Sequence, residues 1–201
     1  YPWKEMDGQT PITSSVFKQI KNELGIKGKW IGLGALYSIN EEFAKAEKSY
    51  ITEELAPYTK KIEFYDQQYA DKVNESGSDQ EKDFIDFIFT YSSLRGYTSE
   101  RALNMCYWRK KSPVPEDIDL HRDNCGVLWY CPLVPNKPED VELAIQIIEN
   151  TSTKYKMEPN IGFLFISERV LDITGAICFD KSNAQEDNNA KLCHDEIISK
   201  M

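Results

Sequence analysis

The 201-residue sequence has only two histidines and fewer basic than acidic residues. His121 and His194 form neither an HxH nor an HxxxH spacing, so no metal site is predicted from local spacing. The 33 acidic residues outnumber the 24 Lys and Arg residues and give a formal net charge of −9. This balance argues against a nucleic-acid or anionic-membrane surface, because phosphate binding needs clustered positive charge.

Long hydrophobic runs and targeting patterns are also missing. The chain has no apolar stretch of about 18 residues, the length that suggests a membrane-spanning helix. Its first residues lack the charged-then-apolar plan of a signal peptide. We therefore expect no membrane partner. Because the first residue is Tyr1 rather than Met, we expect the chain to be a fragment or a processed product.

The spacing of the cysteines indicates neither a disulfide scaffold nor a metal site. Their number is odd, their spacing is irregular and no CxxC occurs, which disfavours both a disulfide scaffold and a zinc site. Cys125 and Cys131 are six residues apart on one expected strand, roughly 20 Å and too far to bridge. Reduced thiols fit a cytoplasm-like compartment. The five are Cys106, Cys125, Cys131, Cys178 and Cys193.

Common catalytic motifs are absent as well: there is no GxGxxG, no P-loop and no GxSxG. Gly32 and Gly34 form only a GxG inside an expected strand, so they predict close packing rather than phosphate binding. The one basic cluster, 109–111, reads as a solvated loop. Cys106 and His121 could form a Cys–His nucleophile of a small hydrolase, although a buried, inert thiol is the favoured interpretation.

The segment Asn124–Pro135 (NCGVLWYCPLVP) is the most informative part of the chain. Its apolar run is rich in aromatic and branched side chains, which predicts a buried strand over about 126–134. Pro138 lies in the first turn of an expected helix from 138 to about 155. A strand at 161–166 and another at 170–179 follow, joined by a turn so tight that the two must form an antiparallel hairpin.

A similar order of elements is predicted earlier in the chain. A strand at 29–37 leads into a helix over about 40–56, opened by a Ser38-x-x-Glu41 capping box, and a second strand follows at 60–65. The sequence thus predicts an α+β fold, an antiparallel sheet built from a duplicated β-α-β (ferredoxin-like) unit with helices packed on one face. The two halves are about 25–95 and 124–201.

The remaining segments carry simpler predictions. The first dozen residues are loop-like, a helix is expected from Thr13 or Ser14 to Leu24, and polar residues 67–80 predict a mobile loop. The other predictions are a helix over about 84–94, a short strand at 103–108, a charged connector at 110–124, and a last helix opened by Ser182-x-x-Gln185.

Charged and aromatic residues meet around the turn between the last two strands. Arg169 and Asp172 flank it, with Phe163 and Phe165 on the preceding strand. They could line a cleft for an aromatic or acidic ligand. A surface salt bridge across the turn is the simpler alternative.

Six motifs follow one another in an order similar to a known family. Together they resemble the cap domain of the vanillyl-alcohol oxidase / p-cresol methylhydroxylase family of FAD-linked oxidoreductases, over about residues 10–201. The motifs are WIGLGALYSxxE at 30–41, YWR at 107–109, GVLWYCPLV at 126–134, FxxxRxxxI at 165–173, FDKSN at 179–183 and CxxEII at 193–198.

This resemblance implies a partner domain and a cofactor. In the family the cap lies over the flavin of a separate FAD-binding domain, which is built from sequence on both sides of the cap. Para-substituted phenols or related aromatic alcohols pass a hydride from their benzylic carbon to the flavin. We therefore expect FAD in the full-length protein but not on this chain alone, which should not catalyse anything by itself.

The resemblance also suggests residues that face substrate or flavin. Arg169 matches a family arginine, Asp172 lies where members tend to have a cavity-facing histidine, and Phe163 lies where one branch has an acid. Cys106, with Tyr107 adjacent, lies where some members link flavin through tyrosine. We take these five as candidates and assign no catalytic residue.

A second flavin-linking position in the family is a histidine just before the strand motif, and here it reads Val127. We expect residues 1–201 to form a single cap-like domain whose FAD-binding domain is absent from this chain. The expected partners are that domain and an aromatic small molecule; a homo-oligomer is also compatible. The alternative is a stand-alone α+β binding or protein-interaction module with an acidic surface.

Overall fold

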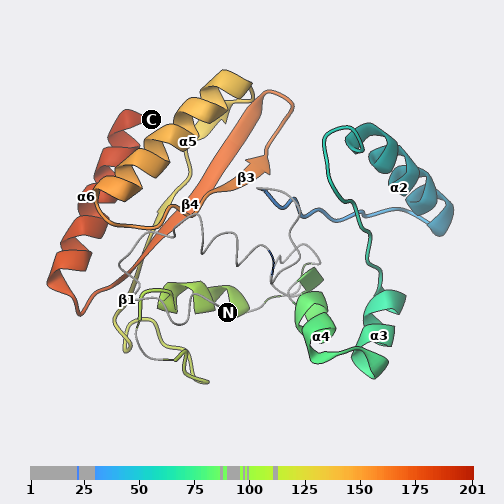
Figure 1. Cartoon of the computed structure of the whole chain (residues 1–201), viewed down its shortest axis with the longest axis horizontal. Coiled ribbons are helices and arrows are strands. Elements are labelled where there is room, and N and C mark those ends of the chain that lie inside the picture. The colour runs from blue at the N-terminus through green and yellow to red at the C-terminus, as the bar shows by residue number, and fades with distance from the viewer. Residues whose placement is uncertain are drawn as a thin grey trace. The chain divides into compact units, whose positions relative to one another are not determined.

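The computed structural model describes residue 22 and residues 30–86, 88, 89, 96, 98, 100–110 and 113–201 (Figure 1). The chain divides into two compact units. Of the described residues, those from 22 to 102 belong to one, which we call the N-terminal unit, and those from 103 to 201 to the other, which we call the C-terminal unit. Each is described by itself. Among the described residues, no helix is both long and apolar enough to cross a membrane.

The C-terminal unit is built on a four-stranded antiparallel sheet with the long strand β4 (Val170–Asp180) at its centre (Figure 1). The strands β1 (Cys125–Tyr130), β2 (Leu133–Pro135) and β3 (Gly162–Phe165) all pair with β4. The predicted α+β class with an antiparallel sheet is confirmed, and so is the predicted hairpin of the last two strands.

The single strand predicted over 126–134 is interrupted at Cys131-Pro132, which separates β1 from β2. Proline has no backbone N–H to give to a ladder, so it locally ends strand pairing. Both strands nevertheless keep one register on β4, and the N–H of Ile173 donates to the Pro132 carbonyl at 3.0 Å.

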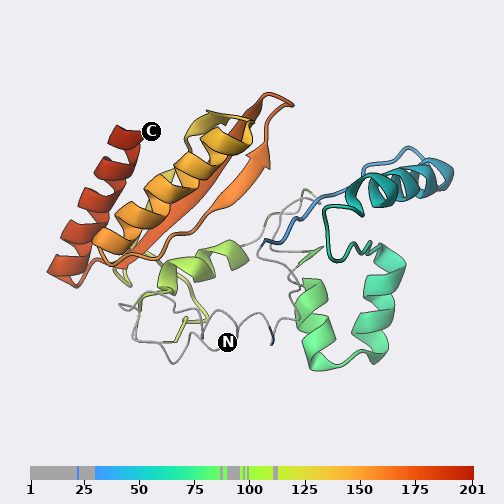
Figure 2. The same ribbon diagram turned by 45° about the horizontal axis from the view of Figure 1, so that its top comes forward.

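Two helices cover one face of this sheet. They are α5 (Pro138–Lys154) and α6 (Ala184–Lys200), which lie side by side in Figure 2. Pro138 fits the first turn of α5, where its missing N–H costs no hydrogen bond. Asn183 caps α6 by accepting from the Gln185 and Glu186 N–H groups, so the predicted Ser182 cap is wrong by one residue.

The main core lies between these helices and the sheet. Every second residue of β4 points into it, as strand geometry requires. At one of these positions only glycine fits, because a Cβ on Gly175 would come within 2.2 Å of the Tyr130 ring. The buried core residues are Tyr130, Ala144, Ile148, Met157, Leu171, Ile173, Ile177, Phe179, Ala190, Cys193 and Ile197.

The N-terminal unit is helical in its described part. The helix predicted over 40–56 is confirmed as α2 (Glu41–Leu55), although its cap is Asn40 and not the predicted Ser38. Residues 30–38 and 61–66 form no strand, so the strands predicted at 29–37 and 60–65 are wrong. The described residues therefore contain the strand–helix–strand order only once, and the duplication is not specifically confirmed.

The mobile loop predicted over 67–80 is wrong. Two helices, α3 (Gln67–Ser76) and α4 (Asp79–Asp86), occupy it. The Glu81 carboxylate accepts from the backbone N–H and the hydroxyl of Ser78, at 2.8 and 2.7 Å, which forms a capping box at the start of α4. Ala70 and Val73 of α3 then pack against Ile85 of α4.

Two further predictions differ from the structure or lie partly outside it. The strand predicted at 103–108 is wrong, because η3 (Arg101–Tyr107) is a 3-10 helix. The helix predicted over 84–94 is described in α4 only as far as Asp86. Apart from residue 22, the predicted loop and helix of residues 1–24 lie outside the described residues.

Candidate functional site

The candidate site is the side of the sheet that faces away from α5 and α6. Residues paired directly across antiparallel strands point to the same side. The register places Asp172 of β4 between Leu133 of β2 and Leu164 of β3. Thr174, two residues after Asp172 on β4, points to the same side of the sheet. So does Trp129 of β1, which pairs with Ala176 of β4. We call the five residues Trp129, Leu133, Leu164, Asp172 and Thr174 the outer face.

The outer face combines exposed apolar side chains with buried polar atoms. Trp129 is 53% exposed, Leu133 66% and Leu164 55%. In contrast, Asp172 Oδ1 and Thr174 Oγ1 are buried and have no hydrogen-bond partner within the described part of the chain. Leaving one such atom unsatisfied costs about 1–3 kcal/mol, so a pair on one face calls for an explanation.

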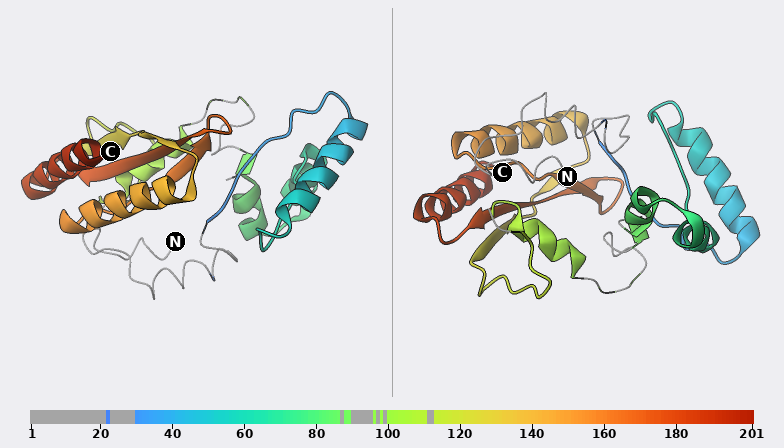
Figure 3. Two further views of the ribbon diagram at one scale, coloured as in Figure 1. Left: turned by 90° about the horizontal axis from the view of Figure 1, so that it is seen from above. Right: turned by 60° about the horizontal axis from the view of Figure 1, so that its bottom comes forward.

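The same side of the sheet is covered farther along by η3, opposite α5 (Figure 3). Cys106 and Tyr107 of η3 pack against Cys125 and Val127 of β1. The Tyr107 hydroxyl donates to Asp123 at 2.6 Å. Burial, together with this carboxylate, raises the pKa of Tyr107 to about 12. Tyr107 is thus a neutral, structural hydrogen-bond donor at physiological pH.

The thiols between η3 and the sheet differ in acidity. Burial raises the pKa of Cys125 to about 11. A hydrogen bond between the Cys106 and Cys178 thiols lowers the pKa of Cys106 and raises the pKa of Cys178. His121 is exposed, and its backbone N–H donates to Asp119. The structure therefore places Cys106 beside another thiol and not in a Cys–His pair.

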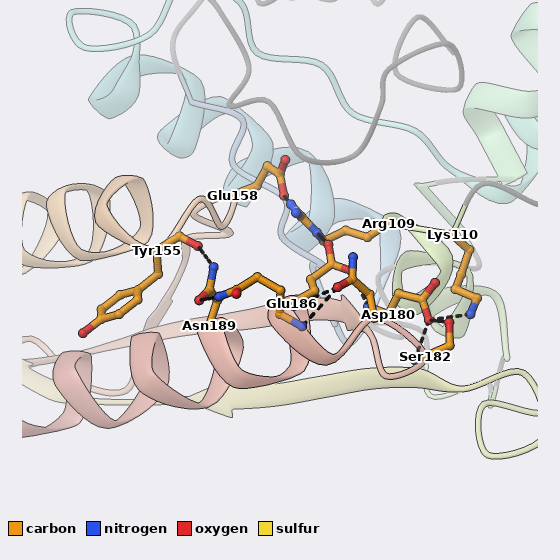
Figure 4. Close-up of polar contacts among 10 residues, drawn as sticks. Arg109, Lys110, Tyr155, Glu158, Asp180, Ser182, Glu186 and Asn189 are labelled. Atoms are coloured by element: carbon orange, nitrogen blue, oxygen red, sulfur yellow. Dashed lines mark hydrogen bonds and ion pairs between the residues drawn. The ribbon is translucent and has the colours of Figure 1, made fainter.

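Arg109 and Lys110, the described residues of the basic cluster, do not form the solvated loop that the sequence suggests. The Arg109 guanidinium is buried and donates to Glu158 and Glu186 (Figure 4). Glu186 in turn accepts from the Asp180 N–H at 2.9 Å, and Lys110 pairs with Asp180 at 2.8 Å. This network fixes the segment after η3 to the start of α6.

No local pattern could have revealed these ion pairs, because Arg109 is 49 and 77 residues away from its two partners. The only hint was that Arg109 directly follows the aromatic pair Tyr107-Trp108. Burial raises the pKa of Glu158 even though the guanidinium favours its charged form. Among the described residues, no group of three His, Cys, Asp or Glu side chains could hold a metal.

The structure does not gather the five predicted site residues in one place. Phe163 packs against the core on the helix side, whereas Asp172 lies on the outer face. The Arg169 side chain is 87% exposed and pairs with Glu168 at 3.8 Å. Cys106 and Tyr107 are buried between η3 and β1. The role of each residue in binding remains a prediction.

Comparison with known proteins adds two similarities, while no family model matches. The chain is 30% identical over 207 residues to "1'-carboxy-chondrochloren decarboxylase" of Chondromyces crocatus, and the match covers all of this chain and 38% of that protein. The structure is similar to 4-ethylphenol oxidase from Gulosibacter chungangensis, solved with isoeugenol. That match covers 96% of this chain, with a TM-score of 0.66 and 16% identity.

The chain shares its fold with part of this 4-ethylphenol oxidase, as the sequence resemblance to a vanillyl-alcohol oxidase / p-cresol methylhydroxylase cap domain predicts. The resemblance seen in the sequence is thereby confirmed. The chain spans about a third of each of these two proteins, 38% of the decarboxylase and 32% of the oxidase chain.

Proposed function

We propose that this chain is the cap, or substrate-binding, domain of a flavin-dependent oxidoreductase that acts on para-substituted phenols or related aromatic alcohols. The observation that carries the proposal is the fold match to a 4-ethylphenol oxidase over 96% of the chain. Because the chain spans about a third of that oxidase, we infer that catalysis needs further sequence and that the cap is not competent alone.

The outer face is suited to be one wall of a cavity for an aromatic ring. Trp129, Leu133 and Leu164 present an exposed apolar surface around the two polar side chains of β4. Such a surface would bury a ring and exclude water, while a small number of polar groups orient the ligand.

A bound flavin would accept the hydride from the benzylic carbon of the substrate. The basic side chains beside η3 offer no site for the diphosphate of such a cofactor. Arg109 and Lys110, the basic side chains beside η3, are already paired with carboxylates, so they are not available to clamp phosphates. We therefore assign FAD binding to a partner domain in cis.

The experiment compares the 201-residue chain with the full-length protein encoded by the surrounding reading frame. We expect flavin absorbance and oxidation of 4-ethylphenol only in the full-length protein. Stoichiometric FAD on the isolated chain, or a full-length protein without flavin, would overturn the proposal.

A matched pair of variants tests the role of the outer face. Leu164 on β3 and Leu143 on α5 are almost equally exposed, 55% and 57%, but Leu143 lies on a helix. In the full-length protein we expect Leu164→Asp to lower kcat/KM at least tenfold, on the order of the loss of one well-placed apolar contact. Leu143→Asp should stay within about twofold. Equal effects would show that the outer face does not line the substrate site.

A further inference from the structure

We infer that Asp172 and Thr174 together bind a hydroxyl group on the benzylic carbon of the aromatic ligand. The inference rests on the proposed function and names a chemical group that the substrate must carry. Its basis is that Asp172 Oδ1 and Thr174 Oγ1 are both buried on the outer face without a hydrogen-bond partner among the described residues.

The two atoms lie on the same side of one strand. Residues two apart on a strand share a face and are about 7 Å apart along it. Leu133 and Leu164 flank Asp172 across the sheet, and Gly162 is paired with Thr174. Since Gly162 has no side chain, β3 places no side chain directly beside Thr174. The residues paired with Asp172 and Thr174 in the register are therefore two leucines and a glycine.

Arg169, the basic residue nearest to Asp172 in sequence, is exposed and pairs with Glu168. Lys110 pairs with Asp180 at the opposite end of β4. Asp172 is thus not part of an ion pair described for this strand or its preceding turn. A group that satisfies it must come from outside the described cap.

The chemistry of the pair favours a hydroxyl over other groups. An ionised carboxylate only accepts hydrogen bonds, whereas a threonine hydroxyl can both donate and accept. A ligand hydroxyl can donate to Asp172 and accept from Thr174, and it satisfies both atoms when the two side chains converge on it. A ligand carboxylate would be repelled by Asp172, and an alkyl group would leave both oxygens unsatisfied.

The test uses the full-length protein and two substrates that differ by one hydroxyl, 1-(4-hydroxyphenyl)ethanol and 4-ethylphenol. We measure the ratio of their kcat/KM values. In the unmodified protein the hydroxylated substrate should be favoured about tenfold or more, as expected for a site with buried polar partners. Asp172→Leu and Thr174→Val should each reduce that ratio at least fivefold, and Thr174→Ser should restore it because it keeps the hydroxyl.

A matched control separates ligand binding from stability. Thr151 of α5 also has a buried hydroxyl without a partner, but it lies on the helix side of the sheet. We expect Thr151→Val and Thr174→Val both to raise the Tm of the ligand-free protein, since each removes an unsatisfied oxygen. Only Thr174→Val should change the substrate ratio.

The outcomes are distinct. Unchanged ratios in Asp172→Leu and Thr174→Val, with both phenols still oxidised, would overturn this inference and leave the proposed function standing. Equal changes in Thr151→Val and Thr174→Val would also overturn it, since the effect would then come from stability. If neither phenol is oxidised, the proposed function fails and this inference fails with it.

Discussion

The two units of this chain differ in how far their apolar residues are buried. In the C-terminal unit, eleven buried residues form one cluster between β4 and two helices. In the N-terminal unit, the 15-residue helix α2 has no buried residue, and the described core consists of Ala70, Val73 and Ile85. The difference shows that apolar composition alone does not decide burial.

Two similar segments make this lesson specific. Residues 30–38 (WIGLGALYS) and 126–134 (GVLWYCPLV) are both rich in apolar and aromatic residues and both precede a helix. The second segment forms strands because β4 offers a complementary ladder of N–H and C=O groups. The first pairs with no described strand, and Ile31 and Tyr37 remain exposed. A strand requires a partner as well as a pattern.

The largest expected contrast is between ion pairs. Arg109→Met would leave Glu186 charged and buried, so we expect a loss of about 3–5 kcal/mol in the free energy of unfolding. Lys61→Met removes an exposed pair with Glu63 and should cost at most about 1 kcal/mol. Urea unfolding measures both. If the two variants lose the same stability, burial does not distinguish these pairs.

The next contrast concerns one isoleucine in each unit. Ile148 of α5 is fully buried, whereas Ile51 of α2 is only partly buried. We expect Ile148→Ala to cost about 2–5 kcal/mol through lost contacts and a cavity. Ile51→Ala should cost well below that range. A cost for Ile51→Ala as large as that for Ile148→Ala would mean that α2 packs more tightly than its exposure indicates.

A smaller effect is expected at two asparagine caps. Asn183 caps α6 and Asn40 caps α2 through the same side-chain oxygen. Each Asn→Ala change should weaken its own helix by about 1 kcal/mol. Hydrogen exchange in both variants should show faster exchange in the first turn of the affected helix, but only Asn183→Ala should lower the unfolding midpoint of the C-terminal unit. A lower unfolding midpoint of the C-terminal unit in Asn40→Ala would contradict the prediction that each cap stabilises only its own unit.

The smallest contrast depends on pH. Hydrogen bonds from Lys154, Lys200 and Tyr155 lower the pKa of Glu196 to about 2. Since this folded-state pKa lies below the unfolded value of about 4.3, the stabilisation is present above pH 4.3 and is lost as pH falls toward 2. We expect the free energy of unfolding of Glu196→Gln to depend less on pH between about 4.3 and 2 than that of the unmodified protein. Glu41→Gln, which removes a single exposed pair, should change the profile less; an equal change would contradict the prediction.

Much of the C-terminal unit could be predicted because its signals are local. Pro138 at a helix start, the tight turn before β4 and the alternation along it identify α5 and the hairpin. The order of motifs also identified the family fold. The helix α3 and the first turns of α4 were not predicted because a polar composition indicates a loop, although Asp66 and Ser78 carry capping signals.

The candidate site was predictable only in part. Asp172 was identified from its place beside the turn and from the family resemblance, but Thr174 was not. The reason is physical: whether a polar oxygen on a strand lacks a partner depends on which side chains face it from β2 and β3. That information lies in the register between strands and not in the strand itself.

The sequence by itself determined the α+β class, the helices that start at local caps, and the resemblance to a flavoprotein cap, because these depend on short-range periodicity and motif order. Only the tertiary structure decided the rest. It broke one predicted strand at Pro132, paired Arg109 with distant carboxylates, and placed Asp172 and Thr174 together on the outer face. These features arise from contacts between segments far apart in the chain, where hydrogen-bond partners and burial are set by packing and not by neighbouring residues.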